Sequence, residues 1–195
     1  MWVKICGITN LEDALHACLC GADALGFVFY PKSPRFIEPR NVKEIVKKLP
    51  LHIKKVGLFV DCSAAEINLI CQEAGLDMAQ IYGEVNEAFH NALEVPYLRV
   101  IRAQKQDDIF LQEGTLRLVD AYVPNYGGEG KRIPLSWFEN HDNSHIIIAG
   151  GLNADNLDEL IPLGFYGVDV SSGVEQSHGI KDKAKVKAFI EKAKA

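Results

Sequence analysis

Short apolar runs alternate along the chain with longer segments whose apolar positions recur at helical spacing. The apolar runs predict strands at 2–6, 24–29, 55–60, 78–82, 97–101, 116–120, 145–149 and 167–170. The intervening segments predict helices at 9–20, 41–49, 63–73, 84–93 and 181–194, with weaker helical turns at 106–112, 135–140 and from 153 onward. Each strand is followed by a helical segment, so the chain consists of β-then-α units.

Capping residues mark the beginning and end of several predicted helices. Thr9 is followed three residues later by Glu12, the pattern of a capping box, so we expect Thr9 to be the N-cap of the first helix. Gly21 is expected to end that helix. Ser63 is expected to cap the helix at 63–73, and Asn153 to open a helix after the seventh strand.

The regular alternation of strand and helix predicts parallel strands joined by right-handed crossovers. The eight units are long enough to close into a compact (β/α)₈ barrel of 195 residues. We therefore predict an α/β protein in which residues 1–195 form one barrel domain. A doubly wound open sheet is the alternative, and the missing G-x-G-x-x-G after the first strand argues against its nucleotide-binding form.

Composition narrows the class of protein. Hydrophobic residues make up 48% of the chain and charged residues 24%, which is typical of a soluble globular protein. The net charge of −5 predicts no general attraction to nucleic acid or anionic membranes. The apolar runs are too short to span a bilayer and no signal peptide is recognisable, so a cytoplasmic location is expected.

Cysteine and histidine usage points the same way. The five cysteines, an odd number, favour a reducing compartment. Cys18 and Cys20 are spaced C-x-C without a second pair that would complete a zinc site, and the six histidines include no H-x-x-x-H pair. We therefore expect no metal.

Chemically useful residues gather where predicted strands end, which is where barrels of this kind place their active sites. These residues are Cys6, Arg35, Tyr82, Arg102, Asp120, Gly150, Gly151, Asp169, Ser171, Ser172 and Gly173. Taken singly, most of them also fit structural roles: a buried thiol, a loop-capping aspartate, a solvated arginine or ordinary turn glycines. Together they predict a functional site.

Two glycine-containing loops follow the seventh and eighth predicted strands. The pairs Gly150-Gly151 and Ser171-Ser172 with Gly173 allow backbone N–H groups to approach an anion closely, which predicts a phosphate site. Cys6 and Asp120 lie on other loops and offer a thiol and a carboxyl as base and acid. The loop at 121–134 contains several glycines and is expected to act as a mobile cover, but it lacks P-loop spacing.

The chain resembles the phosphoribosylanthranilate isomerase family of tryptophan biosynthesis. The segments that carry the resemblance are 3–9 (VKICGIT), 26–35 (GFVFYPKSPR), 120–124 (DAYVP), 126–131 (YGGEGK), 149–152 (AGGL) and 168–175 (VDVSSGVE). The resemblance implies a (β/α)₈ barrel enzyme. It would catalyse the Amadori rearrangement of N-(5-phosphoribosyl)anthranilate to 1-(2-carboxyphenylamino)-1-deoxyribulose 5-phosphate.

The resemblance also implies roles for individual residues. Asp120 would be the general acid that opens the sugar ring, and Cys6 the general base that removes the C2 proton. Arg35 would hold the substrate carboxylate. The substrate phosphate would be bound at Gly150, Gly151, Asp169, Ser171, Ser172 and Gly173. No cofactor is implied, and the only partner is a small phosphosugar, acted on by a monomer or homodimer.

One position departs from the family pattern. The family usually has Gln-Leu-His-Gly at the end of the fourth strand, whereas this chain has Gln80-Ile81-Tyr82-Gly83. A phenol titrates near pH ~10, so Tyr82 is a hydrogen-bond donor at neutral pH and not a base. We expect Tyr82 to support the site, with reduced but real activity.

Other functions also fit parts of the pattern. One is a sister phosphosugar isomerase acting on a phosphoribosylformimino substrate, but such an enzyme would use two aspartates, and this chain has Cys6 in place of the first. A second is a non-catalytic phosphate-binding barrel, which only Tyr82 supports. A third is a thiol redox sensor built on Cys6, Cys18 and Cys20.

Overall fold

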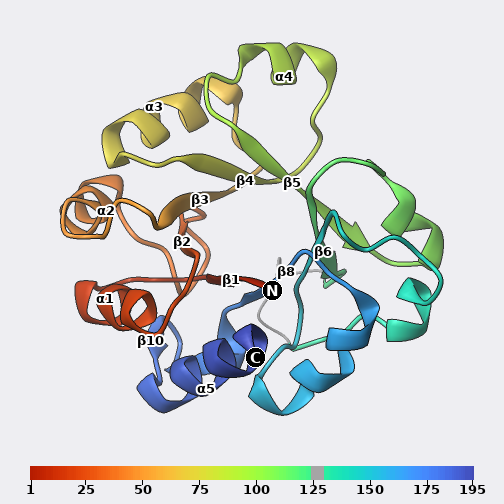
Figure 1. The fold of residues 1–195 in the computed structure, drawn as a ribbon. Helices are drawn as coiled ribbons and strands as arrows, with labels where there is room; N and C mark the ends of the chain where they lie inside the picture. The colour runs from red at the N-terminus through yellow and green to blue at the C-terminus, as the bar shows by residue number, and fades with distance from the viewer. Residues whose placement is uncertain (124–129) are drawn as a thin grey trace.

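Parallel strands close into a barrel, as the alternating pattern predicts (Figure 1). The structure, a computed structural model, describes residues 1–123 and 130–195. Its barrel strands are β1 (Trp2–Ile5), β2 (Ala24–Val28), β3 (Lys54–Val60), β4 (Met78–Tyr82), β5 (Tyr97–Ala103), β6 (Arg117–Ala121), β7 (Ile146–Ile148) and β8 (Gly167–Val170). Each strand pairs with the next, and β8 pairs in parallel with β1, so the sheet has no free edge. The (β/α)₈ prediction is confirmed, and the open-sheet alternative is wrong.

Helical segments surround the barrel in Figure 1. The α-helices are α1 (Leu11–Leu19), α2 (Pro39–Val46), α3 (Ala64–Ala74), α4 (Glu87–Ala92) and α5 (Lys183–Lys194). The 3₁₀ segments are η1 (Gln106–Phe110), η2 (Leu135–Phe138), η3 (Ala154–Glu159), η4 (Ile161–Leu163) and η5 (Ser172–Val174). Within the described ranges, no helix is long and apolar enough to cross a membrane.

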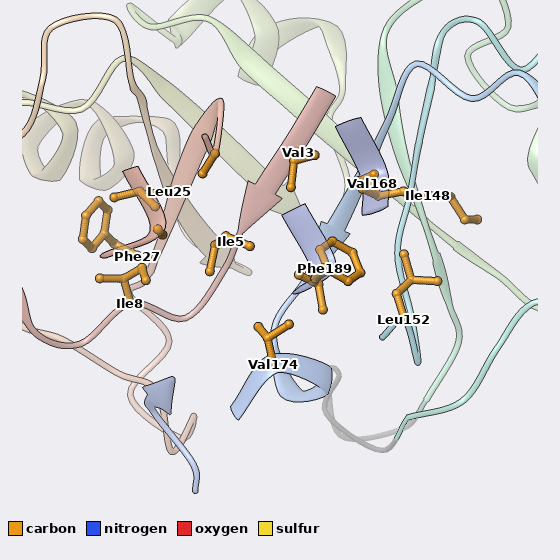
Figure 2. Packing of buried hydrophobic residues seen from close by; sticks show 14 of the residues in the cluster. Val3, Ile5, Ile8, Leu25, Phe27, Ile148, Leu152, Val168, Val174 and Phe189 are labelled. Atoms are coloured by element: carbon orange, nitrogen blue, oxygen red, sulfur yellow. The ribbon is translucent and has the colours of Figure 1, made fainter. Parts of the chain in front are cut away.

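The alternation of side chains along the strands separates two apolar clusters. On β1, Val3 and Ile5 point outward and share one cluster with Phe189 of α5 (Figure 2). The barrel interior holds a smaller cluster that includes Leu98, Leu118 and Ile147. Because successive strand residues face opposite sides, the residues next to Val3 and Ile5 on β1 face the barrel interior.

The first helix begins one residue later than the capping-box pattern predicts. Its N-cap is Asn10, whose side chain accepts a hydrogen bond from the backbone N–H of Asp13 at 2.8 Å. Thr9, the predicted cap, instead donates its hydroxyl hydrogen bond to the carbonyl of Gly179. The predicted caps Ser63 and Asn153 are confirmed, although Asn153 opens a 3₁₀ turn.

A short hairpin that the sequence pattern did not predict follows β8. It consists of β9 (Glu175–Ser177) and β10 (Ile180–Lys181), which pair antiparallel before α5 begins. The backbone N–H of Lys181 donates to Asp13 of α1 at 2.8 Å, and this contact fixes the hairpin against the barrel. The predicted helix over 181–194 therefore begins at Lys183, with Asp182 as its N-cap.

Candidate active site

A cavity lies at the carboxyl ends of the barrel strands. The predicted site residues that line it are Cys6, Arg35, Tyr82, Asp120, Gly150, Gly151, Asp169, Ser171, Ser172 and Gly173. Parallel strands in a closed barrel bring their ends to one rim, and this explains why residues far apart in sequence meet here.

Cys6 follows β1 directly and is 4% exposed. Its backbone N–H donates to the carbonyl of Val170 at 2.8 Å, which extends the pairing of β1 with β8 by one residue. Burial raises the pKa of the thiol, and the nearby Lys4 ammonium opposes that rise by favouring the thiolate. The thiol therefore ionises more readily than it would if burial acted alone.

Asp120 lies near the end of β6 and contacts Tyr82 of β4. The Tyr82 hydroxyl donates a hydrogen bond to Oδ2 of Asp120 at 3.2 Å. Burial and the neighbouring Asp169 carboxylate raise the pKa of Asp120 to about 6, against the opposing hydrogen bond from Tyr82. Burial also raises the pKa of Tyr82 well above its ordinary value, so the phenol remains a donor. Asp120 is suited to hold and release a proton near neutral pH.

Arg102, another predicted strand-end residue, lies in register with Asp120 on the neighbouring strand β5. Its guanidinium donates to the carbonyl of Val123 and lies 4.6 Å from the centre of the Tyr122 ring. Its positive charge lowers the pKa of Asp120. Arg102 thus supports the rim of the site rather than lining the cavity.

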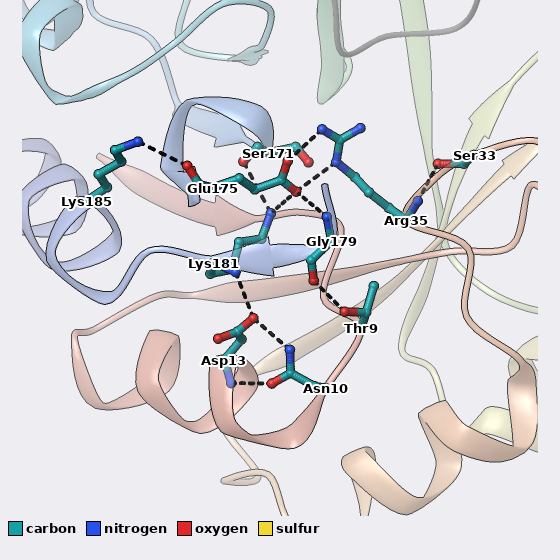
Figure 3. Close-up of polar contacts among 10 residues, drawn as sticks. All are labelled: Thr9, Asn10, Asp13, Ser33, Arg35, Ser171, Glu175, Gly179, Lys181 and Lys185. Atoms are coloured by element: carbon teal, nitrogen blue, oxygen red, sulfur yellow. Dashed lines mark hydrogen bonds and ion pairs between the residues drawn. The ribbon is translucent and has the colours of Figure 1, made fainter. Parts of the chain in front are cut away.

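Arg35 is held by a buried ion pair that the sequence did not reveal. Its Nε donates to Oε1 of Glu175 at 2.8 Å and its Nη2 to Oε2 at 2.7 Å, a bidentate contact (Figure 3). Lys181 of the hairpin donates to the same carboxylate at 2.9 Å. Burial alone would raise the pKa of Glu175, but the hydrogen bonds and positive charges of Arg35 and Lys181 lower it overall. Two cations share one carboxylate, which leaves a net positive charge beside the cavity.

The predicted phosphate loops lie against each other. The φ angles of Gly150 and Gly151 are 91° and 64°, in the left-handed region that favours glycine. A Cβ placed on Gly173 would lie 1.8 Å from the carbonyl oxygen of Leu152, so only glycine allows these two loops to approach. The backbone N–H groups of Gly151, Ser172 and Gly173 donate to no acceptor within 1–123 and 130–195.

The phosphate role predicted for Asp169 needs revision. Its Oδ1 accepts a hydrogen bond from Nζ of Lys4 at 2.9 Å, and its side chain lies in the barrel with Cys6 and Asp120. A carboxylate repels a phosphate dianion. The sequence pattern placed Asp169 correctly at the strand end, but it did not indicate the direction of the side chain.

The helical turn that Asn153 opens after β7 offers few free backbone donors to an anion. The backbone N–H groups of Asp155 and Asn156 donate to the side chain of Asn153 at 2.9 and 3.2 Å. These donors are therefore already occupied. The N–H groups of Gly151, Ser172 and Gly173, which have no acceptor among the described residues, are better placed to receive an anion.

The glycine-rich loop predicted as a cover is only partly described. Gly127, Gly128 and Glu129 lie outside the described residues, as do 124–126. Gly130 and Lys131 are described, and both line the cavity. In the described part of the chain, no group of three or more His, Cys, Asp or Glu side chains is arranged to hold a metal ion.

Lys4, Glu175 and Lys181 are site residues that the sequence pattern did not indicate directly. For Lys4 a signal existed, because it precedes Cys6 by two residues in a strand and must face the same side. Glu175 belongs to a segment of the family resemblance, but nothing in its spacing links it to Arg35. Lys181 lies in the unpredicted hairpin.

Comparison with known proteins gives one consistent result. The family model described as N-(5'-phosphoribosyl)anthranilate isomerase matches residues 3–192. A protein named N-(5'-phosphoribosyl)anthranilate isomerase from a Nitratiruptor species is 55% identical over 194 residues, covering 100% of this chain and 99% of the relative.

Solved structures extend the similarity to the fold. A phosphoribosyl anthranilate isomerase in complex with reduced 1-(o-carboxyphenylamino)-1-deoxyribulose 5-phosphate is 33% identical, with a TM-score of 0.85, covering 100% of this chain and 98% of that one. A structure of monomers generated from the dimeric enzyme of Thermotoga maritima is 32% identical, with a TM-score of 0.85 and the same coverage. The similarity spans the barrel and all of its strand ends.

Proposed function

This chain belongs to the N-(5'-phosphoribosyl)anthranilate isomerase family, and we propose that its cavity performs the reaction with Cys6 as general base and Asp120 as general acid. The protein is an isomerase of tryptophan biosynthesis that rearranges N-(5-phosphoribosyl)anthranilate to 1-(2-carboxyphenylamino)-1-deoxyribulose 5-phosphate. The formimino isomerase, the non-catalytic barrel and the redox sensor are therefore set aside. The observation that carries the assignment of roles is the presence of a thiol and a carboxyl of raised pKa in one phosphate-compatible cavity.

The first step opens the sugar ring. Asp120 gives its proton to the ring oxygen while the bond from that oxygen to C1 breaks. The lone pair of the anthranilate nitrogen forms a double bond to C1, which yields a protonated Schiff base. A carboxyl whose pKa is about 6 is suited to this proton transfer.

The second step moves a proton from the substrate to Cys6. The thiolate removes the proton from C2, and the electron pair flows toward the positive nitrogen to give an enolamine. Protonation of C1 and loss of the hydroxyl proton at C2 then give the ketone. Because the substrate nitrogen accepts the electrons, we propose that no cofactor takes part.

Binding contacts orient the substrate for these steps. The guanidinium of Arg35 is fixed by Glu175, and we propose that it holds the anthranilate carboxylate. The apolar side chains of Val28, Leu58 and Val60 line the cavity and offer a surface for the aromatic ring. The amides of Gly151, Ser172 and Gly173 would bind the phosphate. Binding energy from these remote groups places C2 against the thiol.

The proposed pair predicts a specific pH dependence of kcat/KM. Activity requires a proton on Asp120 and none on Cys6, although the pKa of Asp120 is about 6 and that of Cys6 is raised above its ordinary value. Between these values the pair holds one proton, and a small constant fraction carries it on Asp120. We expect kcat/KM to be flat there, to fall below about pH 6 as a second proton binds, and to fall again above the thiol pKa.

The loss of anthranilate-amine fluorescence at low substrate concentration measures this profile across about pH 5 to 10. Phosphoribosylanthranilate is generated in situ because the assay needs it fresh at each pH. An enzyme whose rate climbs only above pH ~8 would contradict the assignment of Asp120 to the lower limb. No fluorescence loss at any pH would contradict the isomerase activity itself.

Tyr82→Phe removes the phenol hydroxyl that donates a hydrogen bond to Asp120. That hydrogen bond lowers the pKa of Asp120, so we expect the lower limb of the pH profile to move to higher pH. We also expect kcat to fall about threefold to tenfold, the range for one lost hydrogen bond. Tyr82→His is the comparison variant because it restores a donor. If Tyr82→Phe keeps both the wild-type turnover and the wild-type limb, and Tyr82→His brings no gain, position 82 is a bystander.

We propose that the enzyme works in the cytoplasm on a small phosphosugar, without a nucleic-acid or membrane partner. All five cysteines are free thiols, and the base Cys6 must stay reduced to function.

A homodimer is one of the two expected assembly states, the other being a monomer. The related Thermotoga maritima enzyme is dimeric, and Leu19 and Leu51 of this chain are 87% and 97% exposed.

A further inference from the structure

Lys4 is a fully buried lysine that the mechanism above does not use. It lies in the middle of β1, and its exposed fraction is 0%. Because Cys6 is two residues later and lines the cavity, the Lys4 side chain lies in the barrel interior beneath the thiol. Taking an ammonium out of water is costly, so its presence there calls for a compensating role.

The contacts of Lys4 join it to two cavity residues. Its Nζ donates to Oδ1 of Asp169 at 2.9 Å, and this ion pair keeps the ammonium charged. A Cβ built on Gly26 of β2 would lie 2.7 Å from Sγ of Cys6 and 2.9 Å from Nζ of Lys4. The sulfur and the nitrogen therefore border the same small space, which exists because residue 26 has no side chain.

We propose, on the premise that Cys6 is the base, that Lys4 is a positioning residue whose ammonium, oriented by Asp169, stabilises the Cys6 thiolate in the space left by Gly26. The charge of Lys4 lowers the pKa of the thiol, and the charge of Asp169 raises it. Asp169 thus has two effects: it holds the ammonium in place, and its negative charge partly offsets the effect of the ammonium on the thiol pKa.

Other charged or titratable groups also act around the thiol. Lys181 lowers the thiol pKa less than Lys4 does, and its own ammonium donates to Glu175 and to the carbonyl of Ser171. Tyr82 and Asp120 approach from the β4 and β6 side of the cavity. Among these groups, Lys4 lowers the thiol pKa most and therefore offsets the effect of burial most.

A purely stabilising role is a poor explanation for the buried ion pair between Lys4 and Asp169. Replacing a buried ion pair with apolar side chains is often neutral or stabilising, so stability alone does not explain the pair between Lys4 and Asp169. An electrostatic role instead predicts opposite effects for the two partners. Removing Lys4 should make the thiol harder to ionise, and removing the Asp169 charge should make it easier.

The test measures the alkylation of Cys6 by iodoacetamide as a function of pH, with modification quantified on the peptide that contains Cys6. Compared with the wild type, we expect the midpoint to move up by about one pH unit or more in Lys4→Met and to move down in Asp169→Asn. A structural role would not move the two midpoints in opposite directions. No shift in Lys4→Met, or the same direction in both variants, would overturn the proposal.

The pH profile of kcat/KM gives a second readout. For each unit by which the thiol pKa rises, the fraction of enzyme with a proton on Asp120 and a thiolate on Cys6 falls tenfold. In Lys4→Met we expect a plateau at least about tenfold lower and an upper limb displaced to higher pH by the same number of units. A lower plateau with an unmoved upper limb would contradict the proposal.

Asp169→Asn and Cys6→Ala separate the possible failures. If Lys4→Met does not fold, Asp169→Asn decides alone, because a midpoint that rises or stays unchanged there overturns the proposal. If Cys6→Ala retains full activity, the proposed base is wrong. If Cys6→Ala is inactive while Lys4→Met keeps the wild-type alkylation curve, the base stands and the role of Lys4 fails.

Discussion

Cys6→Ala is expected to lower kcat/KM for phosphoribosylanthranilate by a factor of about 10³, the middle of the range for losing one general base. Cys6 directly follows β1 and its thiol lines the cavity. Alanine at this position provides no base. The rate of anthranilate-amine fluorescence loss measures the effect. Binding of a reduced product analogue should stay close to that of the wild type, because the phosphate and carboxylate contacts remain.

Cys71→Ala is the matched control for this change. Cys71 is also buried, at 2% exposure, but it lies on α3 and does not line the cavity. Losing its sulfur should cost some stability and leave turnover intact. If Cys6→Ala retained more than about a tenth of the wild-type rate, general-base catalysis by Cys6 would be excluded.

Asp120→Asn is expected to lower kcat by a factor of about 10³ as well. The amide has nearly the same shape, and its oxygen can still accept the hydrogen bond from Tyr82. It cannot give a proton to the ring oxygen, so ring opening loses its acid. The same fluorescence assay measures the loss, and the pH profile should lose its lower limb near pH 6, which is assigned to Asp120.

Asp142→Asn serves as the control for Asp120→Asn. Asp142 is an exposed aspartate outside the cavity. We expect its turnover to match the wild type. Equal activity in Asp120→Asn and Asp142→Asn would mean that another group, or water, supplies the proton.

The barrel was predictable because its signal is local and repeated. Each strand is a short apolar run next to an amphipathic segment, and strict alternation leaves few possible topologies. The site followed from this topology, because residues that end parallel strands must meet at one rim. Cys6, Tyr82 and Asp120 could therefore be grouped although they come from three separate strands.

The contacts between loops could not be predicted. Arg35 and Glu175 are separated by 140 positions, and the hairpin after β8 contains the carboxylate that meets the guanidinium. Asp169 was placed correctly at a strand end but assigned to the phosphate, since spacing does not show that its side chain meets Lys4. Pairings of this kind depend on three-dimensional packing.

The first helix shows the same limit on a smaller scale. Thr9 and Asn10 are both good capping residues, and the capping-box spacing favoured Thr9. The structure instead uses Asn10, because the Thr9 hydroxyl donates to Gly179 of the distant hairpin. A tertiary contact decided between two nearly equal local choices.

The most direct test of the two catalytic roles is the kinetic isotope effect of deuterium at C2 of the substrate sugar, compared between Cys6→Ala and Asp120→Asn under single-turnover conditions. If Cys6 removes the C2 proton, this step limits the rate in Cys6→Ala, and a large primary isotope effect is expected. If Asp120 opens the ring, ring opening limits the rate in Asp120→Asn, and no isotope effect is expected there. The same isotope effect in both variants, or the reverse order, would contradict the assignment of base and acid.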